Sequence, residues 1–450
     1  MSPAGSARAV CFANRGVRLQ EAFGGVGTRP RTLHSACLGS HFSRSTLGAL
    51  QGGRRSWGIG LDIACRLRLS VFGLSSHVLG QKRGGLRRAL EEETFFGAGV
   101  RHDGRSSHEV IDDPAWGATR FLRGLKDTAR VQLGTSGSGN HFVEFGTFDV
   151  PEDLGPAQAA AITPLEPGHS YLALLSHSGS RGVGKKICDR YSKVAEERRP
   201  GLEGEAKKLA WLELSSEEGQ EYWPPMRLAG RFAAANHTVI HERIARRISA
   251  EAAFVTEHHH NFAFAEEWRG EEMIVHRKGA TPADPGVLGI VPGTMADPGY
   301  LTMGLGVDES LNSASHGAGR RMSGTRAFKD LDGAAWREDL RQKGIALLGG
   351  ALDEAPAAYK DPRAVMASQA DLVEAVGGSH QASCAWMPDP RRTGVAGGRT
   401  RARKRVGRVC ARLSRGNRCR VRGGSYGGSR AEQPLPVRAF LPRGLGPAAC

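Results

Sequence analysis

Histidines concentrate in short loops of the central part of the chain, and they are the first residues that could do chemistry. Of the 16 histidines in the 450-residue sequence, 14 lie between residues 57 and 390. Four of them, His141, His177, His260 and His316, stand in loops with glycine, asparagine or serine. Glycine lets a backbone approach a ligand closely, and imidazole serves as a metal ligand or as a nucleophile. These loops therefore predict one convergent site with one or both of these chemistries.

A carboxylate and a thiol stand three residues apart at Asp62 and Cys65. At this spacing both side chains can face one cation. Together with the histidines they form a mixed donor set of oxygen, sulfur and nitrogen. Such a set suits Zn²⁺ as readily as Mn²⁺, so the residues predict a metal centre without naming its ion.

Glycine-rich segments near these histidines could bind phosphate. Segment 134–140 combines glycines with hydroxyl side chains, and its backbone N–H groups could cradle an anion. Basic residues at 277–278 and 320–321 add cations. Segment 179–185 matches the Gly-x4-Gly-Lys pattern of a P-loop, but Lys186 follows where that motif needs Ser or Thr for Mg²⁺. We expect a chance match there, with a P-loop nucleotidase as an alternative function.

Strands and helices must alternate around these loops to bring them together. The apolar patterns predict strands at 171–175, 272–276 and 287–291, and helices at about 187–194, 227–250 and 363–376. The sequence thus predicts an α+β fold with mixed sheets, flanking helices and long Gly-rich active-site loops.

The formal net charge of +16 is carried by the two ends of the chain. Residues 1–56 hold eight basic and one acidic side chain, residues 391–450 hold sixteen and one, and the centre has a net charge of −6. We therefore expect an atypical, poorly ordered basic segment at 1–56, a catalytic domain at 57–385 and a disordered basic tail at 386–450. The tail could bind nucleic acid or could simply be solvated.

Cysteine usage and hydropathy bear on where the protein acts. The centre keeps three widely spaced cysteines, which form no disulfide framework and favour a reducing compartment. No stretch approaches eighteen apolar residues, so we expect no membrane span. We expect a cytoplasmic protein, although residues 1–56 also have the composition of an organelle transit peptide.

Taken in order, these motifs resemble the RtcB family of RNA-splicing ligases over about 57–385. The matching segments are 60–65, 133–144, 177–182, 260–261, 276–281, 291–295, 312–320 and 353–361. The resemblance implies an RtcB-like fold and a GTP-dependent enzyme with two Mn²⁺ ions. It implies joining of an RNA 3′-phosphate or 2′,3′-cyclic phosphate end to a 5′-hydroxyl end, in tRNA splicing or RNA repair. RNA with such ends is the expected partner.

The resemblance also implies roles for individual residues. His316 matches the histidine that takes GMP covalently, and Tyr359 resembles a residue that stacks on guanine. The implied metal ligands are Asp62, Cys65, His141, His177 and His260, with the Cys65 thiolate bridging two ions. The implied guanylate contacts are Asn140, His141, Phe142, Val143, Glu144, His260, Asn261, Pro292, Gly293, Thr294, Met295, His316, Gly317, Ala318, Gly319 and Tyr359.

The chain departs from the family pattern at both ends and at one internal position. The family's Met-Pro-Asp-x-His-x-Gly segment has no counterpart in residues 1–56, and Gly299 stands where the family has a second guanylate-contacting serine. The family's terminal lysine, which contacts guanine, has no counterpart after residue 374. We hypothesise that residues 1–56 and 377–450 are not family sequence, as from a gene-prediction error. The alternative function is then a catalytically impaired RNA-binding relative.

Overall fold

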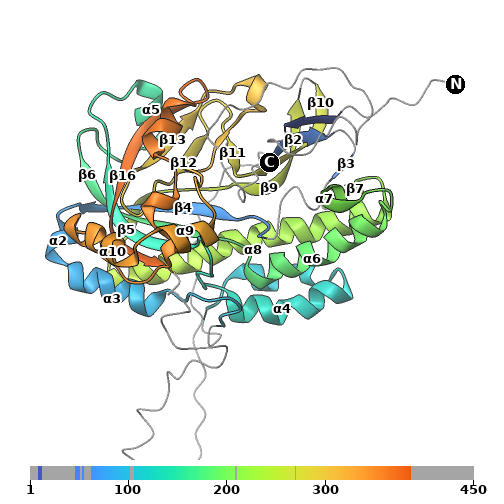
Figure 1. Ribbon diagram of the computed structural model, residues 1–450, viewed down its shortest axis with the longest axis horizontal. Coiled ribbons are helices and arrows are strands. Elements are labelled where there is room, and N and C mark those ends of the chain that lie inside the picture. The colour runs from blue at the N-terminus through green and yellow to red at the C-terminus, as the bar shows by residue number, and fades with distance from the viewer. Residues whose placement is uncertain are drawn as a thin grey trace, which may run out of the picture. The chain divides into compact units, whose positions relative to one another are not determined.

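The computed structural model describes residues 9–12, 46–50, 53–54, 62–101, 106–207, 210–268 and 270–386. In these residues one large, mostly antiparallel sheet is covered by helices, with smaller sheets beside it (Figure 1). The predicted α+β class is confirmed.

The large sheet places the ends of four strands side by side. Its order is β12 (Leu288–Val291), β13 (Gly299–Gly304), β16 (Val373–Trp386), β5 (Phe142–Asp149), β6 (Ser170–Ser178), β4 (Arg66–Ser75) and β8 (Ala252–His259), with β15 (Ala346–Leu347) parallel to β16. Within it, His177 pairs with Phe142 on one side and with Leu67 on the other, and Leu67 pairs with His258. The starts of β4 and β5 therefore meet the ends of β6 and β8 at one edge.

Three smaller sheets lie within the described residues. They are β1 (Ala9–Phe12), β2 (Thr46–Leu50), β10 (Glu271–Lys278) and β9 (Asn261–Trp268) in one sheet, β11 (Ala280–Pro282) with β14 (Ser313–Ser315), and β3 (Gly53–Arg54) with β7 (Leu212–Glu213). β9 starts directly after the loop residue His260, and β14 ends directly before His316. These sheets thus carry two of the predicted site residues.

The helices cover the large sheet. They are α2 (Val78–Gln81), α3 (Arg83–Glu93), α4 (Arg120–Gln132), α5 (Pro156–Ala161), α6 (Arg181–Glu197), α7 (Gly204–Lys207), α8 (Glu217–Ile248), α9 (Gly324–Asp330), α10 (Gly333–Gln342) and α11 (Pro362–Ala367). The long helix α8 runs beneath the sheet, with α3, α4 and α6 near it (Figure 1).

Two apolar cores hold the faces of the sheet. On the α8 side, Phe145 and Leu174 pack with Ile240 and Ile244 of the helix. The opposite core contains Leu69, Phe148, Leu175 and Trp336 of α10, among others. Because neighbouring residues of a strand point to opposite faces, β4, β5 and β6 contribute to both cores.

Most predicted elements are found, with longer bounds. The strands predicted at 171–175, 272–276 and 287–291 correspond to β6, β10 and β12, and the helix at 187–194 lies in α6. The helix predicted at 227–250 is α8, which begins earlier because Ser216 Oγ caps it by accepting the N–H of Gly219 at 3.1 Å.

The helix predicted at 363–376 is wrong in its second half. The helix α11 ends at Ala367, and β16 begins at Val373. β16 pairs with β13 and with β5 in the middle of the large sheet, so pairing partners outweigh local helix propensity. In 1–56, which showed no strand periodicity, residues 9–12, 46–50 and 53–54 form short strands, and β2 pairs with β10.

The other expectations for 1–61 and those for the tail after residue 386 lie outside the described residues. So do the predicted poor order of the ends and most of the hypothesis that they are not family sequence; of the residues from 377 onward, 377–386 are described and lie in β16. In the part of the chain that is described, no helix combines the length and the apolar character needed to cross a membrane.

The buried Phe145 gives a direct test of the fold. Its side chain is fully buried between β5 and α8, so Phe145→Ala should lower the free energy of unfolding by about 3–5 kcal/mol. Val255→Ala, at a side chain that is 41% exposed on β8, should change it by about 0.5 kcal/mol or less. Urea denaturation followed by circular dichroism measures both, and equal effects would contradict the described packing.

Candidate metal centre and active site

The five predicted metal ligands meet at one edge of the large sheet. Cys65 and His141 directly precede β4 and β5, respectively. His177 is the penultimate residue of β6, and His260 directly follows β8. Since β5, β6, β4 and β8 are neighbours in this order, the strand register alone brings these side chains together. Asp62 joins them through a tight turn before β4.

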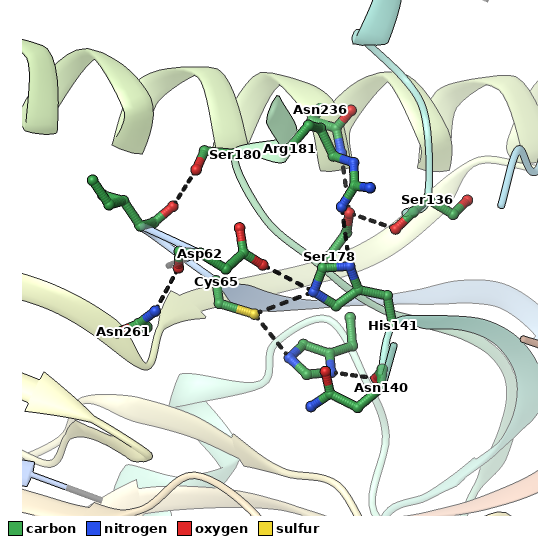
Figure 2. Close-up of polar contacts among 12 residues, drawn as sticks. Asp62, Cys65, Ser136, Asn140, His141, Ser178, Ser180, Arg181, Asn236 and Asn261 are labelled. Atoms are coloured by element: carbon green, nitrogen blue, oxygen red, sulfur yellow. Dashed lines mark hydrogen bonds and ion pairs between the residues drawn. The ribbon is translucent and has the colours of Figure 1, made fainter. Parts of the chain in front are cut away.

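The donor atoms lie within contact distance of one another (Figure 2). Cys65 Sγ is 3.1 Å from His177 Nε2 and 3.6 Å from His141 Nε2. His177 Nε2 is 3.1 Å from His260 Nε2, and His141 Nε2 is 2.9 Å from Asp62 Oδ2. The thiol and the imidazoles of His141 and His177 form a buried group whose ligand atoms all lie within 4.8 Å of one another.

A strained turn aims Asp62 and Cys65 at the same point. Ala64 has φ of 62°, in the left-handed region, where a residue with a Cβ is disfavoured. Asn261 holds the turn: its Nδ2 donates to Asp62 O at 2.5 Å, and its carbonyl accepts the N–H of Ala64 at 2.8 Å. Gly179 faces the Asp62 carboxylate, where a Cβ would lie 2.3 Å from Oδ1. A larger residue at Gly179 would therefore displace the carboxylate.

Hydrogen bonds set the proton positions of two imidazoles. His177 Nδ1 lies 2.9 Å from Asn140 O; a carbonyl only accepts, so Nδ1 carries the proton and the Nε2 lone pair faces the cluster. Arg181 Nη1 lies 3.0 Å from His141 Nδ1, and a guanidinium only donates. Nε2 of His141 then carries the proton and faces Asp62, so binding of a cation there releases a proton.

Burial perturbs the pKa values of the cluster. It raises the pKa of the Cys65 thiol well above its ordinary value, helped by the charge of Asp62. Burial also lowers the pKa of His177 to about 3 and that of His260 well below its ordinary value. For Asp62, burial acts to raise the pKa, but the hydrogen bond with His141 and the charge of Arg181 outweigh it and lower the pKa. The imidazoles of His177 and His260 are thus neutral at pH 7, as metal ligands must be.

His316 lies beside the cluster. Its ring centroid is 4.7 Å from that of His260, with the rings tilted by 32°. Its Nδ1 is buried and has no hydrogen-bond partner in the described part of the chain, and burial lowers its pKa. A neutral imidazole with a free nitrogen can act as a nucleophile.

The predicted guanylate-contacting residues fall into three groups. Asn140, Phe142 and Asn261 adjoin the metal ligands, and the Phe142 ring lies 5.6 Å from that of His177. Val143 instead points into the core with α8, so its side chain does not face the cluster. Glu144 is also buried.

The second group is the loop 292–295, which lies beside the loop of His316. A Cβ on Gly317 would lie 3.6 Å from Pro292 Cγ. Gly293 has no room for a side chain, since a Cβ would be 2.3 Å from the carbonyl oxygen of Asp297. Thr294 Oγ1 donates to Asp297 Oδ2 at 2.6 Å, and Met295 is buried in the core. These contacts fix the loop against residues 316–319.

The third group centres on Tyr359. Lys360 N donates to Gly319 O at 3.0 Å, and Tyr359 forms a bridge with Arg320. The Tyr359 hydroxyl donates to Glu354, and the Arg320 guanidinium lies 5.0 Å from the centre of its ring. Tyr359 is thus attached to the end of the His316 loop, and no contact with the metal ligands is found in the described residues.

Two of the predicted phosphate-binding cations serve the fold instead. The side chain of Arg277 is completely buried, pairs with Glu266, and donates from Nε to Ser313 Oγ at 2.8 Å. Arg320 pairs with Glu354 at 3.0 Å. Because Ser313 begins β14, Arg277 fixes the strand that leads to His316.

The predicted anion cradle at 134–140 is largely occupied by the protein itself. Gly134 N donates to Asn236 Oδ1 of α8 at 2.8 Å, and Ser178 Oγ donates to Ser136 O at 2.9 Å. The loop therefore anchors α8 to the start of β5.

The chance match at 179–185 is not a phosphate loop. Helix α6 begins at Arg181, so five of the seven motif residues are helical. Lys185 is exposed and pairs with Asp189 one turn later at 2.5 Å. A P-loop lysine must face a cradle of backbone N–H groups, which this arrangement lacks.

Sequence reasoning missed a polar network beneath the cluster. Ser176 Oγ lies 2.6 Å from His237 Nδ1 and 2.7 Å from His241 Nε2, and Asn236 Nδ2 donates to Ser178 Oγ at 3.3 Å. These bonds hold β6 on both sides of the ligand His177. The signal was available, because these three polar residues of α8 interrupt its apolar face at helical spacing.

A buried thiol, three imidazoles and a carboxylate meet here, and a further histidine with one unpartnered ring nitrogen lies beside them. Such a donor set is typical of enzymes with a metal centre. The donor set fits a divalent cation, because burial keeps the Cys65 thiol protonated unless a positive charge compensates its ionisation. The comparisons with known proteins agree with this class.

The family model described as "tRNA-splicing ligase RtcB" matches residues 115–385, so the hypothesis that the chain leaves the family at residue 377 is wrong for residues 377–385. The chain is 29% identical to RNA-splicing ligase RtcB of Escherichia coli over 358 residues, covering 72% of this chain and 82% of that protein. It is 30% identical to tRNA-splicing ligase RtcB of Archaeoglobus fulgidus over 370 residues, covering 67% and 75%. RNA-splicing ligase RtcB of Mycobacterium tuberculosis is 29% identical over 363 residues, covering 68% and 83%. The chain belongs to the RtcB family, and membership implies use of a metal and GTP.

The thiol of Cys65 should dominate cation affinity. Cys65→Ala removes the atom on which two imidazoles converge and should weaken binding of Mn²⁺ and Zn²⁺ at least ~10-fold. Cys188→Ala removes the other buried free thiol, which packs among apolar residues of α6, and should leave affinity unchanged. Equilibrium dialysis of the two variants decides this, and equal affinities would remove Cys65 from the centre.

The metal-free protein should lose stability in acid because its buried histidines resist protonation. His258 accepts the N–H of Ile290 at 2.7 Å, and burial lowers its pKa to about 4. The unfolded chain binds a proton at this site below pH 6.5 and the native state does not. The contribution of neutral, buried His258 to the free energy of unfolding is therefore complete above pH 6.5. It is lost as the pH falls to 4, at about 1.4 kcal/mol per pH unit.

Denaturation with a chelator present, at several pH values, measures this slope. His258→Gln should reduce this slope by about 1.4 kcal/mol per pH unit, which is the contribution of one histidine. The exposed His169→Gln serves as the matched control. A slope that His258→Gln leaves unchanged would contradict the described burial of His258.

Proposed function

We propose that this protein is a GTP-dependent RNA ligase. It joins an RNA 3′-phosphate or 2′,3′-cyclic phosphate end to a 5′-hydroxyl end, in tRNA splicing or RNA repair. The observation that carries the proposal is the position of His316, whose ring lies 4.7 Å from the ring of a cluster histidine while its Nδ1 has no partner in the described residues. Membership of a family named for RNA splicing supports the substrate class.

Asp62, Cys65, His141, His177 and His260 would hold two Mn²⁺ ions. When bound, the ions neutralise charge on the α-phosphate of GTP and on the leaving pyrophosphate. Asn140 O keeps the Nε2 lone pair of His177 directed at the centre. Asn261 holds the turn that presents the carboxylate and the thiol.

His316 acts as the nucleophile. Its nitrogen attacks the α-phosphorus of GTP, a P–N bond forms, and the bond to pyrophosphate breaks. The RNA 3′-phosphate then takes GMP from His316, and a 5′-hydroxyl attacks the activated end while GMP leaves. The lowered pKa of His316 supports this role, because the imidazole must be neutral to attack.

The guanylate would be held by the loops beside His316. The segments 140–144, 260–261, 292–295 and 316–319 carry the residues expected to contact it, and Tyr359 is expected to stack on guanine. Contacts between 319–320 and 359–360 support this grouping. The Val143 side chain belongs to the core, so we assign it to support of this loop.

We further propose that the enzyme acts in the cytoplasm. Its centre depends on a free thiol at Cys65, and Cys188 is also free. A reducing compartment keeps such thiols available as ligands.

The proposal is tested by covalent labelling with radioactive GTP and Mn²⁺. The unmodified protein should retain label after denaturation, in an acid-labile bond as expected of a phosphoramidate, and His316→Ala should lose it completely. Lys185→Ala should label normally, because Lys185 is paired with Asp189 on the surface of α6.

Two outcomes would contradict the ligase assignment. An unmodified protein that takes no label would favour the catalytically impaired relative. Loss of GTP turnover in Lys185→Ala but not in His316→Ala would favour the P-loop nucleotidase.

A further inference from the structure

Positive charge within the central region gathers on two neighbouring helices. Residues 57–390 carry a net charge of −6. By contrast, α4 holds four basic and one acidic residue, and α6 holds five and three. On α3 and α10 the two signs balance. Among these four helices, the net positive charge is thus carried by α4 and α6.

Both helices have one end at the metal centre. Gln132, the last residue of α4, accepts the N–H of Gly182 in the first turn of α6 at 2.9 Å. Arg181, the first residue of α6, reaches His141. The helices lie side by side (Figure 1), and Lys186 Nζ donates to Thr128 Oγ1 at 3.3 Å. Their shared surface therefore starts at the centre and follows the 17 residues of α6, about 25 Å at 1.5 Å per residue.

We call this surface the α4–α6 face and define it by Arg120, Arg123, Lys126, Lys185, Lys186 and Arg190. Three of these cations, Arg120, Arg123 and Lys186, are exposed and have no carboxylate within ion-pair distance in the described part of the chain. The others pair with Asp112, Asp189 and Glu221. The face thus keeps an excess of positive charge toward solvent.

The placement of these charges works against helix stability. Neither helix has an acidic residue in its first turn. Instead, Arg120 and Arg123 lie in the first turn of α4, and Arg181 lies in the first turn of α6. The helix dipole disfavours cations at this end. A ligand that brings negative charge would compensate this cost.

An aromatic ring on the same face indicates a nucleic acid over an acidic protein. The Arg190 guanidinium lies 4.9 Å from the centre of the half-buried Phe121 ring. Arginine planes and aromatic rings are the groups on which unpaired bases stack, next to cations that contact the backbone.

From the proposed function and these observations, we propose that the α4–α6 face binds the single-stranded end of the RNA substrate and leads it to the metal centre. Its contacts are to phosphates and to the flat faces of bases, so recognition along this face is independent of sequence. The cations that have no carboxylate partner attract RNA, which the negative net charge of the central region would otherwise repel.

The test is the salt dependence of RNA binding by the full chain. The probes are two 20-nucleotide single-stranded RNAs of unrelated sequence with 3′-phosphate ends. A triple variant, Arg120→Gln, Arg123→Gln and Lys186→Gln, should bind both at least ~10-fold more weakly at 50 mM salt. The slope of log affinity against log salt should shrink by about 2, since each phosphate contact on a single strand contributes about 0.7.

A matched triple on α3 controls for net charge. Arg83→Gln, Arg87→Gln and Arg88→Gln remove the same charge from a helix outside the α4–α6 face, and both affinity and slope should stay as in the unmodified protein. Thermal unfolding of both triples identifies a variant that fails to fold, in which case the single variant Lys186→Gln, with a slope change of about 0.7, replaces the triple.

The inference is overturned if the α4–α6 triple folds and binds with the slope of the unmodified protein, or if the α3 triple weakens binding equally. Failure of the proposed function is a different result, because the unmodified protein would then take no label from GTP. An acidic protein that binds the face while RNA binding is unaffected would also overturn the inference.

Discussion

The convergence of the Cys65 thiol and three imidazoles at one edge of the large sheet is the constraint on which the rest of the structure depends. Sγ lies 3.1 Å from His177 Nε2, and the next imidazole nitrogen, of His260, lies 3.1 Å beyond that atom. Buried polar atoms at such distances are costly unless each is paired or binds a cation. The surrounding structure has to hold them there. The register of four strands places the donor residues at the same edge of the sheet. Asn261 holds the strained Asp62–Cys65 turn, and Asn140 holds the ring of His177.

The same edge of the sheet explains why His316, the proposed nucleophile, lies where it does. Gly279 N donates to His260 O at 2.8 Å, and Gly279 O lies 3.5 Å from His316 N. The loop of His316 is therefore tied through one glycine to a metal ligand. The buried Arg277, paired with Glu266 and Ser313, stiffens the strands on both sides of this connection. Cation and nucleophile are thus positioned by one set of backbone contacts, which favours attack in a fixed geometry.

The sequence predicted the donor residues of the centre but little of their support. Asp62, Cys65 and the histidines are found together because their residue types and loop contexts reveal their chemistry. Arg277 and Arg320 were misjudged as phosphate ligands, because a sequence does not show that Glu266 and Glu354 lie opposite them. The strand β16 was assigned in part to a helix, since its state is decided by β5 and β13 on either side. His237 and His241 escaped notice because their partner Ser176 is some 60 residues away along the chain.

The central claim is that a cysteine thiolate and imidazoles hold the metal beside His316. X-ray absorption spectroscopy of the Mn²⁺-loaded full chain tests it most directly, because sulfur is distinguished from lighter ligands by its scattering and longer bond. The account predicts a sulfur neighbour together with imidazole nitrogens, and loss of the sulfur signal in Cys65→Ala but not in Cys188→Ala. A metal surrounded by oxygen and nitrogen alone in the unmodified protein would contradict it.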